Sequence, residues 1–146
     1  MTAVLSGSVA TLDGPTVYQI LRLRVDVFVV EQACAYAELD GRDVEPDALQ
    51  LWVEEDGAVL ATLRLLRDDD RTRRIGRVAT ATEARSRGLA RLLMAEALRL
   101  SEGSDVVLDA QSQLEGWYGR FGFQRSGPEF VEDDIPHVPM RRRASR

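Results

Sequence analysis

The segment from Arg77 to Leu100 constrains the fold most, because a strand pattern runs into a helical pattern across a short glycine-containing loop. Val78, Thr80 and Thr82 alternate with small residues, and their branching at Cβ is typical of a strand. Apolar residues then recur at three- and four-residue steps, which predicts a helix with one buried face: Leu89, Leu92, Leu93, Ala97 and Leu100. The loop between the two patterns therefore lies at the N-terminus of a helix.

The loop from Arg85 to Ala90 is chemically suited to phosphate. At the start of a helix the first backbone N–H groups have no intrahelical partner, and the helix dipole adds partial positive charge. Gly88 allows a ligand close to the backbone, Ala90 is nearly as small, and the guanidinium groups of Arg85 and Arg87 can bind phosphate oxygens. On local chemistry alone, a plain strand–turn–helix corner with solvated arginines is an equally good interpretation.

Composition indicates a globular protein. A chain of 146 residues with 45% hydrophobic residues can form a core, so we expect one domain over residues 1–146, with a frayed tail at 140–146. The net charge of −5, with scattered acids, argues against a nucleic-acid partner. No apolar run approaches membrane-spanning length, so we expect a soluble, cytoplasmic protein that does not bind membranes.

The residue types that are rare or missing exclude several chemistries. All 19 cationic residues are arginine, which rules out a Walker-type lysine loop and a lysine Schiff base. Cys34 and His137 are the single cysteine and histidine, so no internal disulfide and no cysteine- or histidine-rich metal site is possible. We expect no metal, and we expect Cys34 to behave as a small hydrophobe.

The N-terminal third predicts a strand, a helix and an irregular segment. A short first strand is expected near Val4–Val9, followed by an amphipathic helix from Pro15 to Val30. We expect Arg22, Arg24 and Asp26 on the wetter side of this helix. Residues 31–50 interrupt any long period and concentrate carboxylates, so this segment is interpreted as functional rather than as core.

The rest of the chain predicts mainly strands. Asp56-Gly57 between two apolar runs indicates a hairpin, and the acidic and basic residues 68–74 are interpreted as a solvated connector. The run Val106-Val107-Leu108 is typical of a buried strand. Gln111 to Arg120 is expected to form a short helix, and closing strands are expected between Phe130 and Met140.

A second motif follows the short strand, and its spine is Tyr-x-x-x-Gly-Phe from Tyr118 to Phe123. Together with Arg-x-x-Gly-x-Ala at residues 85–90, about 30 residues upstream, it resembles the two signatures of the GNAT superfamily of N-acetyltransferases. Gln111 stands where the family often has asparagine. The stretches at residues 28–32, 40–43 and 132–137 resemble the ElaA-like branch of that superfamily.

The resemblance implies an α/β (α+β) fold with a mixed, mostly antiparallel sheet flanked by helices. Two parallel strands, near Val78 and Val107, are expected to splay apart at the cofactor cleft. Acetyl-CoA is the implied co-substrate, and a primary amine, in a small molecule or a peptide, is the implied acceptor, attacking directly in a ternary complex. A homodimer is compatible with this family. Tyr118 is the implied general acid, and the implied cofactor-binding residues are Val78, Ala79, Thr80, Arg85, Ser86, Arg87, Gly88, Leu89, Ala90 and Gln111.

The acceptor side is less constrained. Glu31, Asp40 and His137 are the candidate acceptor-binding residues, and the acidic segment after the first helix suggests a cationic acceptor. An alkyl amine must lose a proton before it attacks, and His137 is the one side chain whose type titrates near neutral pH. The base stays open between this histidine, a water chain and the carboxylates Glu31, Asp40, Asp43, Asp133 and Asp134.

Two other functions are compatible with the same residues. The chain could be a non-catalytic acyl-CoA-binding regulatory module that keeps the cofactor site but no longer turns over an acceptor; Tyr118 argues mildly against this. The chain could also be an unrelated nucleotide-binding domain that uses only the corner at residues 85–90. Tyr118→Phe and the relative affinities for acetyl-CoA and ATP distinguish these hypotheses.

Overall fold

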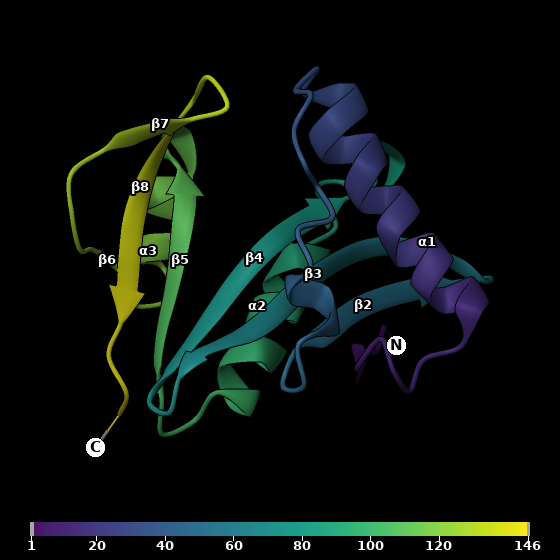
Figure 1. Ribbon diagram of the computed structural model, residues 1–146, viewed down its shortest axis with the longest axis horizontal. Coiled ribbons are helices and arrows are strands. Elements are labelled where there is room, and N and C mark those ends of the chain that lie inside the picture. Colours follow the sequence, from purple (N-terminus) through teal and green to yellow (C-terminus); the bar gives the residue numbers. More distant parts are fainter. Residues whose placement is uncertain (1, 146) are drawn as a thin grey trace.

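The computed structural model describes residues 2–145, which form an eight-stranded sheet with helices on both faces (Figure 1). The strand order is β1-β2-β3-β4-β5-β8-β6, and β7 also pairs with β8. The pair β4–β5 is parallel and its neighbours are antiparallel, which confirms the expected mixed sheet. The strands are β1 (Leu5–Gly7), β2 (Leu49–Glu55), β3 (Ala58–Asp69), β4 (Thr72–Thr80), β5 (Asp105–Gln111), β6 (Gln124–Arg125), β7 (Phe130–Glu132) and β8 (Ile135–Arg142).

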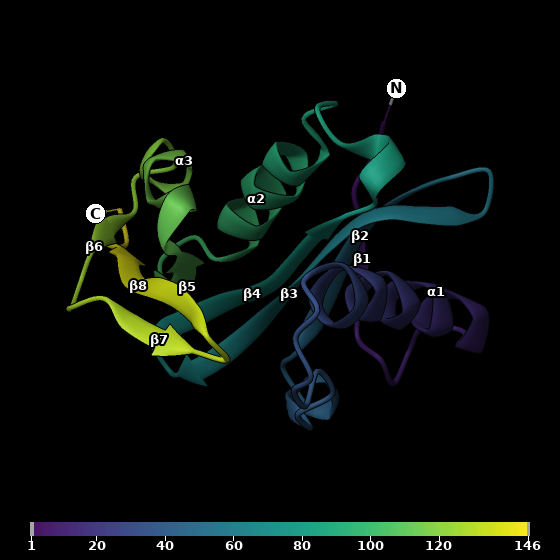
Figure 2. The ribbon, with the colours of Figure 1, turned by 90° about the horizontal axis from the view of Figure 1, so that it is seen from above.

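Helix α1 (Gly14–Val25) covers one face of the sheet, and α2 (Leu89–Leu100) and α3 (Glu115–Gly119) lie on the other (Figure 2). The Asp13 side chain caps α1 by accepting a hydrogen bond from the Thr16 N–H at 2.9 Å, with Pro15 in the first turn. The helix continues as a π-helical turn, η1 (Asp26–Glu31), so the predicted helical extent is confirmed. The remaining short helices are 3₁₀ turns: η2 (Arg42–Val44), η3 (Thr82–Ala84) and η4 (Ser112–Leu114).

The hairpin between β2 and β3 turns at Asp56 and Gly57, as predicted. Both residues have positive φ, 52° and 81°, which matches the turn that best suits the twist of two antiparallel strands. The two strands bring Leu51, Leu63 and Leu65 into the core without any exposed surface. This apolar centre holds β2 and β3 in place beside the parallel pair β4–β5.

The parallel strands β4 and β5 pair only at one end. The ladder runs from Thr72↔Asp105 to Arg74↔Val107, and beyond it the strands separate, as Figure 1 shows. Strand β4 also carries a bulge, because Thr62↔Ala79 and Arg64↔Gly76 enclose one more residue on β4 than on β3. Arg77 lies in this bulge with φ 53°. The expected splayed pair is therefore confirmed.

Two sequence-based expectations are wrong. Arg24 has no exposed surface, although we expected it on the wetter side of α1. The tail at 140–146 was expected to fray, but β8 extends to Arg142 and the Asp105 carboxylate accepts hydrogen bonds from Arg141 at 2.9 Å and from the Ala144 N–H at 2.8 Å. The tail has no apolar period, and the carboxylate that anchors it is distant in the sequence, so no local pattern predicted its order. Arg146 lies outside the described residues.

The segment from Glu31 to Gln50 also differs from its interpretation as a segment outside the core. Glu38, Asp43 and Gln50 are buried around Arg24, so polar side chains form part of the interior here. The expected connector at residues 68–74 is shorter than predicted, because β3 runs to Asp69 and β4 begins at Thr72. Within residues 2–145 no helix is both long and apolar enough to span a bilayer.

Candidate active site

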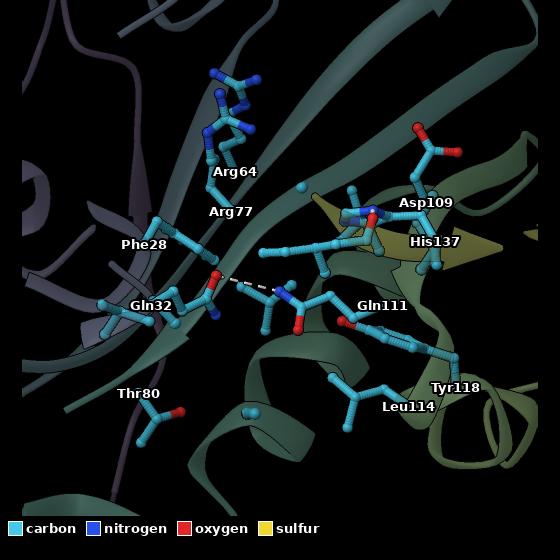
Figure 3. A pocket seen from close by; sticks show the side chains of 18 of the residues that line it. Phe28, Gln32, Arg64, Arg77, Thr80, Asp109, Gln111, Leu114, Tyr118 and His137 are labelled. Atoms are coloured by element: carbon cyan, nitrogen blue, oxygen red, sulfur yellow. Dashed lines mark hydrogen bonds between the residues drawn. The ribbon is translucent and has the colours of Figure 1, made fainter. Parts of the chain in front are cut away.

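A cavity of about 1260 Å³ opens where β4 and β5 separate. Its walls come from both strands, from β8, from the start of α2 and from α3 (Figure 3). Most of the predicted site residues line it together, although they are far apart in the sequence. These are Asp40, Val78, Ala79, Thr80, Arg85, Ser86, Gly88, Leu89, Ala90, Gln111, Tyr118 and His137.

The corner before α2 has the geometry of an anion site. Ser86 and Gly88 both have positive φ, 67° and 76°, and they turn the chain so that the helix begins at Leu89. The N–H groups of the first helical turn, which have no acceptor within the helix, lie along this cavity wall. Arg91 lines the cavity one turn further on; sequence analysis missed it, although it occupies the first turn of the predicted helix.

The two predicted phosphate-binding arginines differ in position. Arg85 lines the cavity, whereas Arg87 does not and pairs with Glu55 at the end of β2. Glu31 was expected near the acceptor, but it is not part of the cavity lining and holds Arg85 in a bidentate pair at 2.7 and 2.8 Å. The hydrogen bond from Arg85 lowers the pKa of the Glu31 carboxyl. The Arg85 guanidinium is thus already paired with a carboxylate of the protein itself.

Residues 31–34, here called the strap, cross the open end of the cleft. Glu31 contacts Arg85, as described, and the Gln111 side-chain amide donates to Gln32 Oε1 at 3.4 Å (Figure 3). Cys34 Sγ donates to the backbone carbonyl of Asp133 at 3.4 Å. Successive strap residues therefore reach the corner after β4, the end of β5 and the turn before β8.

Tyr118 is a buried hydrogen-bond donor at the cavity wall. Trp117 packs edge-on against its ring with centroids 4.9 Å apart, and Phe123 does so at 6.3 Å. Burial raises the pKa of Tyr118 to about 12, so the phenol stays protonated at neutral pH. Figure 3 shows its hydroxyl directed into the cavity beside Gln111. The aromatic packing considered from the sequence is therefore present, and the role of Tyr118 as general acid stays a prediction.

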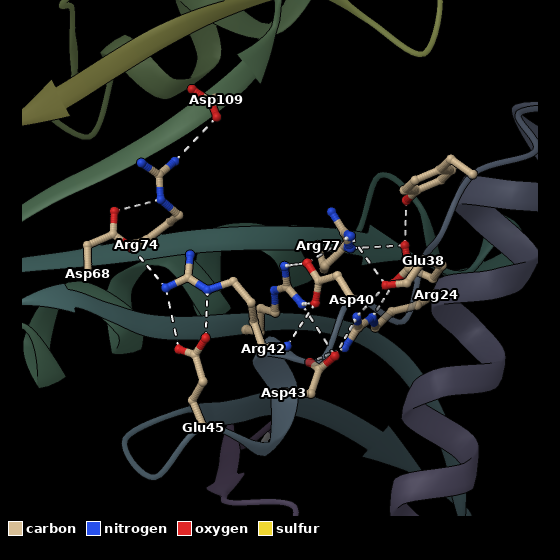
Figure 4. Close-up of polar contacts among 12 residues, drawn as sticks. Arg24, Glu38, Asp40, Arg42, Asp43, Glu45, Asp68, Arg74, Arg77 and Asp109 are labelled. Atoms are coloured by element: carbon tan, nitrogen blue, oxygen red, sulfur yellow. Dashed lines mark hydrogen bonds and ion pairs between the residues drawn. The ribbon is translucent and has the colours of Figure 1, made fainter.

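The α1 face of the cavity rests on a network of arginines and carboxylates: Arg24, Glu38, Asp40, Asp43, Arg64 and Arg77 (Figure 4). Arg24 Nε lies 2.6 Å from Glu38 Oε2, and Arg24 Nη1 lies 2.7 Å from Asp43 Oδ1. This network explains why Arg24 is buried, since its charge is matched in the interior. Its position four residues after Ile20 and three before Val27, on the apolar stripe of α1, was the available sequence signal.

Asp40 lines the cavity but is already engaged. Arg64 donates to both carboxylate oxygens at 2.8 and 2.9 Å, and this holds the pKa of Asp40 well below its usual range. The other acids of residues 31–50 are paired in the same way, which weakens the reason for expecting a cationic acceptor. The pairs are Glu31–Arg85, Glu38–Arg24, Asp43–Arg24, Glu45–Arg42 and Asp47–Arg67.

The narrow end of the cleft is closed by polar and apolar groups that sequence analysis did not single out. Arg74 bridges Asp68 of β3 at 2.8 Å and Asp109 of β5 at 3.3 Å (Figure 4). Ile75 and Leu108, the first residues beyond the parallel ladder, line the cavity and are almost completely buried. Within residues 2–145 no group of three or more His, Cys, Asp or Glu side chains is arranged to hold a metal ion.

The fold and the sequence of this chain have counterparts in known proteins. The sequence profile described as an acetyltransferase (GNAT) domain matches residues 19–144, and the chain belongs to this family. Within the family it is an ElaA-like protein. Protein ElaA of Escherichia coli is 34% identical over 131 residues, covering 86% of each chain. The crystal structure of that protein superimposes with a TM-score of 0.91, covering 97% of this chain and 99% of the other.

Two further relatives agree with this assignment. A UPF0039 protein of Mycobacterium tuberculosis is 45% identical over 138 residues, covering 92% of this chain and 88% of its own. The crystal structure of an acyl-CoA N-acyltransferase from Pseudomonas aeruginosa has a TM-score of 0.92 at 40% identity, covering 97% and 99% of the two chains. The family and its solved structures support acyl transfer from a CoA thioester.

Proposed function

We propose that the protein transfers acetyl from acetyl-CoA to a primary amine by direct attack in a ternary complex. The observation that carries this proposal is that the anion corner before α2 and the protonated phenol of Tyr118 line one cavity. The first suits the pyrophosphate of CoA and the second suits the sulfur.

Acetyl-CoA fits the chemistry of the cavity wall from end to end. Arg85, Arg91 and the free N–H groups at the start of α2 can bind the pyrophosphate oxygens. The pantetheine arm then follows β4, whose residues Val78 to Thr80 line the cavity. Beyond Arg74 the β4 peptide groups that face β5 no longer pair in the parallel ladder, so backbone donors can serve the thioester carbonyl oxygen.

The narrow end of the cleft, where β4 and β5 come together, supports a small acyl group. Ile75 and Leu108 approach each other where the parallel ladder begins, and the Arg74–Asp109 pair spans the same two strands. An acetyl group needs little more room than its methyl, and the two apolar side chains suit that methyl. This supports acetyl as the transferred group in preference to a long acyl chain.

The reaction forms one C–N bond and breaks one C–S bond. The amine nitrogen attacks the thioester carbonyl carbon, and the sulfur leaves with the bonding electron pair. An alkylammonium acceptor loses two protons in forming the amide; one ends on the CoA thiol and the other is released to solvent. Tyr118 delivers the proton to sulfur and regains one from the nitrogen, so the phenol is unchanged after each turnover.

The test of catalysis is a thiol-release assay with acetyl-CoA and a panel of amines comprising n-butylamine, spermidine, a free amino acid and a tripeptide. Tyr118→Phe is expected to bind acetyl-CoA normally and to lose about 100- to 10,000-fold in kcat. The matched control is Tyr18→Phe, whose ring is 68% exposed on α1 and which should keep wild-type activity. Wild-type turnover by Tyr118→Phe would refute the acid role, and binding without turnover of any amine would favour the regulatory module.

The cofactor site is tested separately by isothermal titration with acetyl-CoA, CoA and ATP. Arg85→Glu combined with Gly88→Glu places two carboxylates on the anion corner, and we expect it to abolish acetyl-CoA binding. Tighter binding of ATP than of acetyl-CoA to the wild-type protein would instead favour a nucleotide-binding domain.

A further inference from the structure

We propose that His137 is the base that removes the proton from the acceptor amine, a role that rests on the acetyltransferase function proposed above. The imidazole lines the cavity on the side of β5 and β8, as Figure 3 shows. His137 thus becomes a second catalytic residue, distinct from Tyr118.

Hydrogen bonding sets which nitrogen of the ring is basic. His137 Nδ1 lies 2.7 Å from the backbone carbonyl oxygen of Ile135. A carbonyl oxygen only accepts, so Nδ1 carries the hydrogen, and in the neutral ring Nε2 keeps its lone pair. Phe130 stacks on the imidazole with centroids 5.6 Å apart and planes 19° apart, which fixes the orientation of the ring. The geometry therefore leaves Nε2 of the neutral ring with a lone pair that can take a proton.

The register of the sheet places this base beside the reacting groups. His137 is the direct partner of Gln111 in the β5–β8 ladder, so the two side chains share a face with Cβ atoms about 5 Å apart. Gln111 lies two residues after Asp109, on the same face of β5, and Asp109 pairs with Arg74. Arg74 in turn pairs with Asp68, which contacts Arg42 of η2. His137 therefore lies on the η2 and α1 side of the sheet.

Tyr118 lies in α3, on the opposite side of the sheet from α1 (Figure 2). A thioester held between the separated strands β4 and β5 would expose its sulfur to one side and its carbonyl carbon to an amine from the other. The acid and the base thus reach the reaction centre from opposite sides. This separation lets one group donate a proton while the other accepts one.

The carboxylates around the cavity are weaker candidates. Asp40 is bound by Arg64, which lowers its pKa, and Asp109 and Asp68 share Arg74. On the elements packed around His137, the charged groups that line the cavity are Asp109 of β5, Glu132 of β7 and Asp133 of the following turn. Glu132 and Asp133 are solvent-exposed at the rim. Glu132 and Asp133 are therefore the rivals that the experiment has to exclude.

Each proton has a defined path in this scheme. Nε2 takes one proton from the ammonium form of the acceptor, and the resulting imidazolium releases it to solvent at the cavity rim. The second proton leaves the nitrogen after the C–N bond has formed and replaces the one that Tyr118 gives to sulfur. The products are the amide, free CoA thiol and one solvent proton.

The experiment compares two small amines in the thiol-release assay near neutral pH. n-Butylamine is protonated under these conditions and needs a base, whereas methoxyamine is not protonated and does not. For His137→Gln we expect kcat/KM to fall about 100- to 10,000-fold with n-butylamine and less than about tenfold with methoxyamine. The loss with n-butylamine should shrink as the assay pH rises and the free amine becomes abundant. Acetyl-CoA titration confirms that the variant is folded and loaded normally.

Three further variants and one spectrum complete the test. Asp134→Asn changes a neighbouring turn carboxylate outside the cavity lining and should leave both rates unchanged, and Glu132→Gln and Asp133→Asn should do the same. Because His137 is the single histidine, its ring ¹⁵N signals can be assigned directly and should show a protonated Nδ1 in the neutral form.

Equal losses with both amines, wild-type rates in His137→Gln, or an Nε2-protonated neutral ring would overturn the proposal. A selective loss in Glu132→Gln or in Asp133→Asn would transfer the role to the carboxylate concerned. If the wild-type protein acetylates neither these amines nor any other amine of the panel, it is the proposed function that fails. If the wild-type protein turns over but His137→Gln shows no greater loss with n-butylamine than with methoxyamine, only the role of His137 as base is refuted, and the proposed function stands.

Discussion

Replacing Arg24 with methionine tests whether the buried network holds the α1 side of the fold. The change keeps an apolar stem of similar length but leaves Glu38 and Asp43 without their shared cation, and the side chains of these acids are only 3% and 11% exposed. Removing one partner of a buried ion pair typically destabilises a protein by about 3–5 kcal/mol. Arg64 and Arg77 still contact the two carboxylates at 3.3 and 3.0 Å, so we expect the lower end, about 3 kcal/mol.

The assay is urea unfolding of wild-type protein, Arg24→Met and Arg22→Met at several pH values. Arg22 lies on the same helix with its side chain 65% exposed, so its replacement should change the free energy of unfolding by less than about 0.5 kcal/mol. Without Arg24, burial should raise the pKa of Asp43, and protonation of this carboxylate then relieves the penalty as pH falls. The deficit relative to wild type should therefore narrow between about pH 7 and pH 5. A deficit below about 1 kcal/mol, or one that does not change with pH, would refute this reasoning.

Three further predictions concern the corner and the cavity wall. Glu31→Gln removes the carboxylate that pairs with Arg85, so it is expected to tighten acetyl-CoA binding by up to about fivefold. Unchanged or weaker binding in a titration would show that Glu31 does not compete with the pyrophosphate for Arg85. Gly88→Ala puts a side chain at φ 76° and is expected to lower stability by about 1–2 kcal/mol in thermal unfolding, whereas Gly116→Ala, in a helix with an unobstructed Cβ site, should not. Because the pKa of Asp40 is lowered in the fold, its stabilisation is present above the ordinary value of about 3.9 and is lost as pH falls further. Asp40→Asn should therefore flatten the acid limb of a stability–pH curve.

Local patterns predicted the parts of the fold that local chemistry determines. The Asp56-Gly57 turn needs two residues with positive φ in succession, and the corner at Gly88 needs a small residue before an apolar helical repeat. Both requirements are visible in a short window of sequence. The same holds for the position of Tyr118, which follows β5 in the order that the resemblance implies.

Features that depend on distant partners were not predictable in this way. Arg24 is buried because Glu38 and Asp43 reach it from residues 14 and 19 positions away. Arg87 turns away from the cavity because Glu55, 32 positions earlier in the sequence, lies beside it. The side chain of Asp105 anchors the end of β8 from a strand 36 positions earlier. In each case an arginine has several possible carboxylate partners in the sequence, and only the folded chain determines which of them it meets.

The two ends of the cleft differ in how firmly they are held. At one end, three parallel ladder positions and the Arg74–Asp109 pair join β4 to β5. At the other, the strap reaches the β5 and β8 side through two single hydrogen bonds of 3.4 Å, from Gln111 to Gln32 and from Cys34 to Asp133. Long single bonds between partly exposed groups break more readily than a ladder inside a sheet. The cleft is thus held by more and shorter contacts at its narrow end than at the strap.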